Sequence, residues 1–190
     1  KFIDLVGQLR FQKRWAQSPR VPETSVMGHV LLVAIMGYFC AVKIGACDER
    51  VVNNFLCGLF HDLPEVLTRD IISPVKQATD ELPSIVKKIE DEIVNRELVP
   101  LMEDFFVDEI IYYTSDEFSN RIQIDGKTQV VTWEELNQKY NSEEFKPIDG
   151  KLVRLCDHFS ALMEADISIK HGITSSHLQH GRDDILKNYL

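Results

Sequence analysis

The sequence has no Cys-x-x-Cys pair, no internal repeat and no low-complexity segment in its 190 residues. Its four cysteines, Cys40, Cys47, Cys57 and Cys156, lie in apolar stretches, which favours buried free thiols in a reducing compartment over disulfides. The chain also lacks a run of ~18 uninterrupted apolar residues, and the apolar run over residues 30–42 is too short to cross a bilayer. We therefore expect a cytoplasmic protein with no membrane segment.

Positive charge is scarce as well, with 21 Lys and Arg against 30 Asp and Glu and a net charge of −9. A general nucleic-acid binder needs cations to replace counterions along the phosphates, so we expect no nucleic-acid partner. A small phosphorylated substrate stays open, because a bound metal and one Arg can reverse the local potential. Apolar residues make up 44% and charged residues 27%, and both the balance and the length suit one globular domain.

Apolar residues recur at helical spacing through most of the chain, which predicts an all-α domain. The segment from His61 to Pro74 is broken by prolines and predicts one or two helical turns and a loop. Capping residues are expected at Ser25, Asp48 and Thr174. The longer helices are expected at residues 2–14, 26–43, 49–60, 82–98, 101–112, 133–140, 151–170 and 175–189.

Residues 115–147 follow a different pattern. Residues 121–124 and 129–132 alternate polar and apolar side chains around Asp125-Gly126, which is typical of a hairpin turn. The prediction is therefore a single all-α domain over residues 1–190, with an insertion at 115–147 that holds a small β-hairpin around residues 120–133.

Two ionisable side chains interrupt helices that should be buried. His29 lies in the apolar stretch that begins at Val26, where a lone histidine is more often a hydrogen-bonded core residue than a metal ligand. Asp157 lies on a largely packed side of the helix expected at 151–170. A buried carboxylate without a partner is costly, so either Arg154 or a cation has to compensate Asp157.

The pair His61-Asp62 ends a third apolar run and is followed by Pro64, which breaks the helix and lets both side chains turn toward one ion. Such a dipeptide alone would be an ordinary surface feature. Together with His29 and Asp157 it forms a set of two imidazoles and two carboxylates, which suits one divalent ion of Mn, Fe, Co, Ni, Zn or Mg. Water would complete the coordination and be acidified by the metal.

Three ordered motifs carry a family resemblance: Arg14-Trp15, the segment His-Asp-Leu-Pro-Glu-Val-Leu-Thr-Arg-Asp-Ile-Ile-Ser-Pro-Val-Lys at 61–76, and Lys-Leu-Val-Arg-Leu-Cys-Asp-His-Phe-Ser-Ala at 151–161. Their order and spacing resemble the HD superfamily of metal-dependent phosphohydrolases, most closely the bacterial HD-domain 5′-deoxynucleotidases and their uncharacterised relatives. The resemblance implies an HD-type helical bundle that forms homodimers. It also implies an enzyme that releases phosphate from nucleoside 5′-monophosphates, deoxyribose preferred, by metal-activated water.

The resemblance also implies roles for individual positions. His29, His61, Asp62 and Asp157 match the ligands of one divalent metal ion.

The remaining matches concern substrate and water. Glu65 matches the residue that handles the nucleophilic water, and Asp70 matches a carboxylate near the sugar and phosphate. Arg14 matches the phosphate clamp, and Trp15 the residue near the sugar 2′ carbon that favours deoxyribose. Each also has a structural reading, with Glu65 a surface acid, Asp70 a cap or turn residue, and Arg14-Trp15 packing at a helix end.

The sequence departs from the family at the first ligand, where Met27-Gly28-His29 replaces the usual Ser-Glu-His and leaves the support of that histidine undefined. No histidine lies between His61 and Asp157, which argues against a two-metal site. The alternatives are hydrolysis of another phosphorylated metabolite or a nucleoside triphosphate, and a non-catalytic metal- or nucleotide-binding sensor.

Overall fold

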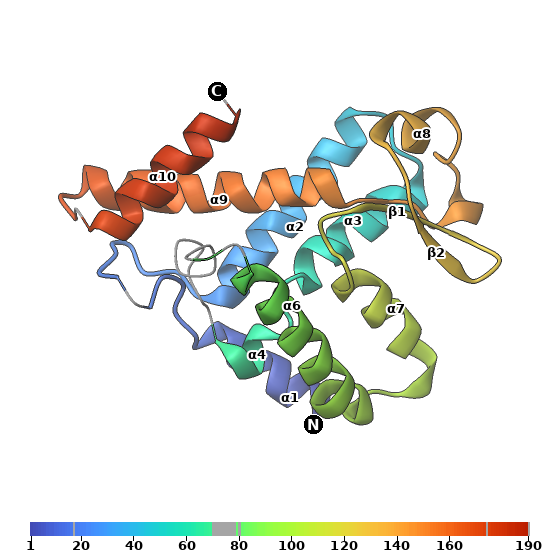
Figure 1. The fold of residues 1–190 in the computed structure, drawn as a ribbon, viewed down its shortest axis with the longest axis horizontal. Helices are drawn as coiled ribbons and strands as arrows, with labels where there is room; N and C mark the ends of the chain where they lie inside the picture. The colour runs from blue at the N-terminus through green and yellow to red at the C-terminus, as the bar shows by residue number, and fades with distance from the viewer. Residues whose placement is uncertain (17, 70–78, 80, 174, 190) are drawn as a thin grey trace. The chain divides into compact units, whose positions relative to one another are not determined.

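Helices form most of the chain, as predicted (Figure 1). The computed structural model describes residues 1–16, 18–69, 79, 81–173 and 175–189. Within those residues the α-helices are α1 (Phe2–Val6), α2 (Val26–Lys43), α3 (Asp48–Phe60), α4 (Glu65–Thr68), α6 (Leu82–Ile93), α7 (Asp104–Thr114), α8 (Trp133–Gln138), α9 (Gly150–Lys170) and α10 (Ser176–Tyr189).

The predicted hairpin is confirmed and belongs to a three-stranded antiparallel sheet. Strands β1 (Asn120–Ile124) and β2 (Lys127–Val130) pair across the turn at Asp125 and Gly126, whose φ values of 50° and 73° are those of a tight hairpin turn. The sequence did not predict β3 (Ile148–Asp149), which pairs with the other side of β1. Two residues are too few to produce an alternating pattern.

Two predicted helices end five or more residues earlier than expected. The first α-helix stops at Val6 and continues only as a 3-10 turn over Gly7–Arg10, since glycine is a poor helix former. Helix α6 stops at Ile93 and passes into a π-helical turn (Val94–Leu98) and a 3-10 turn (Val99–Leu101). The proline at position 100 cannot donate to the preceding turn, which accounts for the altered hydrogen bonding there.

Of the three predicted caps, one is confirmed, one is wrong by one residue and one cannot be compared. Ser25 Oγ accepts the backbone N–H of Gly28 at the start of α2, as expected. Asp48 is the first residue of α3 rather than its cap, which is Cys47. Thr174 lies outside the described residues, and Ser175 Oγ accepts the N–H of Leu178 at the start of α10.

The chain divides into two units. The first comprises residues 1–29, 62–108 and 158–190. One of its apolar clusters is formed by Trp15 with Ala165 of α9 and Leu178 of α10. Gly181 of α10 lies so close to the Trp15 ring that a Cβ there would be 3.0 Å from Cη2, so a larger residue at this position would require the indole to shift by a few tenths of an ångström.

The second unit comprises residues 30–61 and 109–157. Its core cluster is formed by apolar side chains of α2, α3, α7, β3 and α9, namely Val33, Cys57, Tyr112, Tyr113, Ile148, Val153 and Cys156. All four cysteines are free, as predicted, and burial raises the pKa of the Cys156 thiol to about 12.

A buried charged network fixes the insertion to α3 within the second unit. The Arg50 guanidinium donates to both carboxylate oxygens of Asp149, at 2.7 and 2.6 Å, and neither side chain is exposed. Asn54 Nδ2 donates to the same carboxylate at 2.8 Å, and Arg50 also donates to Asn137 of α8 at 3.0 Å. Bidentate pairing of this kind orients both partners, so β3 is held against α3 by a specific geometry, and the Asn137 contact ties α8 of the 115–147 insertion to the same guanidinium.

Helix α2 is long and apolar enough to cross a membrane by length and composition, and among the described helices it alone meets that test. A core helix of a soluble protein meets the same test. Val26, Val30, Val33 and Ala34 of α2 are at most 1% exposed within the protein.

Candidate metal and substrate site

His29 lies in the first turn of α2 and is 1% exposed. Its Nδ1 shares a hydrogen bond of 3.0 Å with Ser160 Oγ of α9. The hydroxyl supplies the support that the sequence left undefined, because a hydrogen bond to one ring nitrogen fixes the orientation of the other. The other nitrogen, Nε2, lies 3.6 Å from Asp62 Oδ2.

His61 directly follows α3 and is 4% exposed. Its Nδ1–H donates to the carbonyl of Gly58 at 2.8 Å, since a carbonyl can only accept. In the neutral ring this leaves the lone pair on Nε2, the atom through which His61 would bind a metal.

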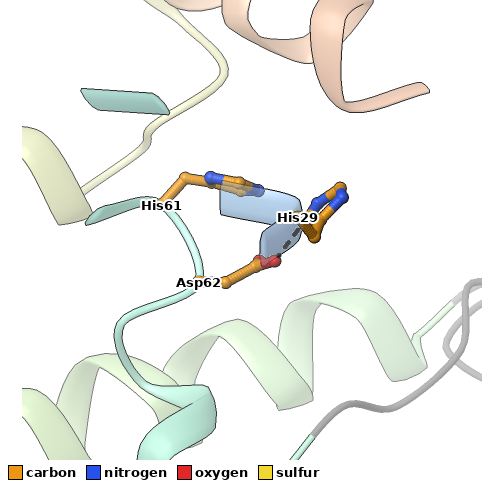
Figure 2. A group of neighbouring side chains, drawn as sticks. All are labelled: His29, His61 and Asp62. Carbon is orange, nitrogen blue, oxygen red and sulfur yellow. Dashed lines mark ion pairs between the residues drawn. The ribbon is translucent and has the colours of Figure 1, made fainter. Parts of the chain in front are cut away.

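The structure brings His29, His61 and Asp62 together, as predicted. Each offers one ligand atom, and these atoms all lie within 4.8 Å of one another. Figure 2 shows the three side chains, with the His29–Asp62 ion pair dashed. Two imidazoles and a carboxylate are a donor set that divalent transition metals accept, so the group fits such an ion chemically.

Asp157, the fourth predicted ligand, is not a member of this group. Its carboxylate lies 3.5 Å from Arg154 Nη1, one turn earlier on α9, and its side chain is 15% exposed. The sequence had left Arg154 or a cation as the compensating charge, and the structure contains the ion pair. A role for Asp157 as a ligand stays a prediction.

Glu65 begins the short helix α4 and is 2% exposed, so the surface-acid reading is wrong. Its backbone N–H donates to the carbonyl of Asp62 at 3.0 Å, which closes a tight turn directly after the metal group. The carbonyl of Val66 accepts from the Gln12 side chain at 3.1 Å and ties α4 to the N-terminal segment. The other predicted catalytic residue, Asp70, lies outside the described residues.

Arg14 lies between two carboxylates of the first unit. Its Nη1 is 3.7 Å from Asp62 Oδ2, and its Nε is 3.6 Å from Glu164 Oε2, while the side chain is only 11% exposed. A predicted substrate residue and a predicted metal ligand therefore share one charged cluster.

Trp15 is 4% exposed and adopts a φ of 56°, a left-handed conformation that bulky residues rarely take. Its indole N–H donates to Glu164 Oε2 at 2.9 Å. The ring packs between α9 and α10 and is therefore anchored in the core of the first unit.

Sequence reasoning missed Glu164. Its carboxylate accepts from the Thr24 hydroxyl at 2.5 Å and lies 3.6 Å from Arg20 Nη2, besides its contacts with Arg14 and Trp15. Burial would raise the pKa of Glu164, but the charges of Arg14, His29 and Arg20 and the Thr24 hydrogen bond outweigh burial and lower it. The available signal was its spacing on the helix, seven residues after Asp157 and four after Ser160.

Comparison with known proteins adds a family and a fold. A family model described as an HD domain matches residues 6–186. A 5′-deoxynucleotidase of Cronobacter sakazakii is 31% identical over 135 residues, which are 66% of this chain and 67% of that protein. One from Vibrio atlanticus is 30% identical over 107 residues, which are 55% of each chain, so the match spans about half to two thirds of these relatives.

Two solved structures share the fold. An HD-domain phosphohydrolase from Listeria innocua superposes with a TM-score of 0.71 at 19% identity, covering 97% of this chain and 76% of that one. An HD phosphohydrolase of cyanophage S-2L, bound to dA and one catalytic Zn²⁺ ion, gives a TM-score of 0.61 at 16% identity, covering 97% and 80%.

Proposed function

The chain belongs to the HD-domain family, and we propose that it is a metal-dependent phosphohydrolase that releases phosphate from nucleoside 5′-monophosphates, with deoxyribose preferred. The observation that carries the proposal is the cluster of His29, His61 and Asp62, whose ligand atoms lie within 4.8 Å. The curated relatives named 5′-deoxynucleotidase and the dA-bound phage enzyme support the choice of substrate class.

His29, His61 and Asp62 would hold the metal. When bound, a divalent ion acidifies a coordinated water and polarises a phosphoryl oxygen. The protein prepares both histidines for this by occupying their Nδ1 atoms, with Gly58 O for His61 and Ser160 Oγ for His29. Each ring would therefore present Nε2.

The chain's own side chains supply the remaining chemistry. We assign Glu65 to accept the proton of the attacking water, because it follows the Asp62 turn directly and is buried from bulk solvent. Arg14 would hold the phosphate, since a guanidinium is a planar donor for phosphate oxygens. Its pairing with Asp62 places that cation beside the predicted metal ligands. Trp15 would form the wall near the sugar.

A phosphate-release screen tests the proposal. Metal-free protein is supplied in turn with Mn²⁺, Co²⁺, Ni²⁺, Zn²⁺ or Mg²⁺ and offered 5′-mono- and triphosphates of deoxyribo- and ribonucleosides. The proposal expects phosphate from 5′-monophosphates, faster with deoxyribose, and only with metal. Release from triphosphates or from phosphorylated sugars alone would favour another phosphohydrolase, and nucleotide binding without release would favour a sensor.

We also propose that the protein acts as a homodimer. Helix α2 carries a stripe of apolar side chains that are 40–65% exposed, namely Leu31, Ile35, Tyr38, Phe39 and Val42. Apolar surface of this kind is typical of a helical face that packs against another protein. Sedimentation at micromolar concentration tests the dimer, and Phe39→Asp should shift it toward monomer.

The setting proposed for this activity is the cytoplasm, without nucleic-acid or membrane partners. Four free cysteines suit a reducing compartment, and the net charge of −9 disfavours polyanions. Fluorescence microscopy of tagged protein in its native host tests the location.

A further inference from the structure

A polar stripe lies on the buried face of α9 within the first unit. Ser160, Glu164 and Ser168 follow one another at four-residue spacing and therefore share one side of the helix. They are only 0%, 7% and 0% exposed. Buried polar groups are destabilising unless they are hydrogen-bonded, so three of them in a row call for partners.

The partners of all three side chains come from the segment 14–29, which carries the predicted phosphate residue, the predicted sugar residue and one of the predicted metal ligands. Ser160 binds His29, and Ser168 Oγ accepts the backbone N–H of Val21 at 2.9 Å. Glu164, between them, contacts the most groups. The stripe therefore holds the described residues of this segment that contact it against α9.

Glu164 uses both carboxylate oxygens within this stripe. Oε1 accepts from Thr24 and faces Arg20, while Oε2 accepts from the Trp15 indole and faces Arg14. Its carboxylate is thus a link between the predicted phosphate clamp and the predicted sugar wall.

The backbone of Trp15 needs such a link. A residue with a bulky side chain at a φ of 56° keeps that conformation only where its surroundings hold it. The hydrogen bond from the indole N–H to Glu164 holds one edge of the ring. Another edge lies against Gly181, whose lack of a side chain leaves room for it. Arg14 directly precedes Trp15 in the chain, so the backbone conformation at Trp15 also affects where the Arg14 side chain leaves the backbone.

We propose that Glu164 is a positioning residue for substrate binding, fixing the Trp15 ring and the Arg14 guanidinium in the orientation that receives a nucleoside monophosphate. The role rests on the proposed nucleotidase function. Glu164 acts through Arg14 and Trp15 and leaves the metal group and Glu65 to perform the reaction. Loss of Glu164 should therefore weaken binding of the substrate more than turnover.

A positioning role and a purely electrostatic role of Glu164 predict opposite changes in KM for the Glu164→Gln variant. If Glu164 acted only as a nearby negative charge, its removal would strengthen binding of a phosphate dianion and lower KM. If Glu164 positions Arg14 and Trp15, the loss of charge-assisted pairing should raise KM by roughly tenfold to a hundredfold, the usual range for such a bond. In that case kcat should stay within about threefold and metal content should not change.

The experiment compares wild type, Glu164→Gln and Asp166→Asn. The last is a matched control, because it removes a carboxylate from the same helix at an exposed ion pair with Lys170. Each is also made with Trp133→Phe, which leaves Trp15 as the sole tryptophan. In Glu164→Gln the fluorescence emission of Trp15 should shift to longer wavelength, and the ring should become more accessible to quenching by acrylamide. Asp166→Asn should match wild type in emission and KM.

An unchanged or lowered KM in Glu164→Gln, with active wild type, overturns the positioning role and leaves the proposed function intact. A wild type that releases no phosphate from any nucleotide overturns the proposed function itself, and this role with it. Should Glu164→Gln not fold, Glu164→Asp serves instead. It keeps the charge but shortens the reach to Trp15, so the positioning role still expects a raised KM and a shifted Trp15 emission.

Discussion

Glu65→Gln should separate proton transfer from metal binding. Glu65 is 2% exposed and is not a member of the group that His29, His61 and Asp62 form. Glutamine has nearly the same volume as glutamate, so the substitution leaves no cavity in the turn after Asp62. It removes the ability to accept a proton and little else.

The expected loss follows from that role. A positioned proton-transfer group contributes about 10²–10⁴ in rate, so kcat for a deoxynucleoside 5′-monophosphate should fall by that factor. This corresponds to a barrier raised by about 3–5 kcal/mol, at roughly 1.4 kcal/mol per decade. KM should change little, because Arg14 and Trp15 are left as they are.

The assay measures released phosphate over a range of substrate concentrations, with bound metal determined by elemental analysis on the same samples. Glu164→Gln provides the complementary pattern, with raised KM and nearly unchanged kcat. Wild-type turnover by Glu65→Gln on every nucleotide would refute the assignment. Loss of metal together with activity would instead make Glu65 part of the ion's binding site.

Three further outcomes are expected. His61→Ala and Asp62→Ala should each lose most of the bound metal, as measured by elemental analysis. Both variants should also melt at a lower temperature, because bound metal stabilises the folded protein. A full complement of metal in both variants would refute the site. Ser160→Ala should weaken metal affinity by about 10- to 100-fold, measured in competition with a chelator, because that is the usual effect of removing a group that orients a ligand histidine. Wild-type affinity in this variant would show that the Ser160 hydroxyl does not support metal binding. Trp15→Ala should narrow the ratio of deoxyribonucleotide to ribonucleotide turnover, and an unchanged ratio would remove Trp15 from sugar selection.

The metal group could be predicted because its signal is local. His29 and the pair His61-Asp62 each interrupt an apolar segment, and an interruption of that kind is visible in any one sequence. The family match over residues 6–186 confirms the resemblance that the motifs suggested. The hairpin was equally local, since Asp125-Gly126 specifies a turn whatever surrounds it.

Other features depend on partners distant in sequence and gave no local signal. Strand β3 exists because Asn120 and Arg121 pair with it, about 28 positions away. Asp157 is a different case, because its partner Arg154 is only three positions away, at 3.5 Å on the same helix, and was one of the two compensating charges that the sequence offered. A sequence pattern can say that a buried carboxylate needs compensation, but it cannot say which of two available charges provides it.

The segment from Arg14 to His29 illustrates the limit most clearly. Trp15 adopts a left-handed conformation without glycine or asparagine to announce it, and the groups that hold it come from α9, about 150 positions later. Arg14-Trp15 was recognised as a motif, but the motif alone does not fix where the guanidinium and the ring point. The acid at position 164 does, because both side chains pair with it. An HD-domain chain that keeps Arg-Trp but has an apolar residue at the position of Glu164 should therefore retain its metal site and bind nucleoside monophosphates poorly, and restoring the acid should lower its KM.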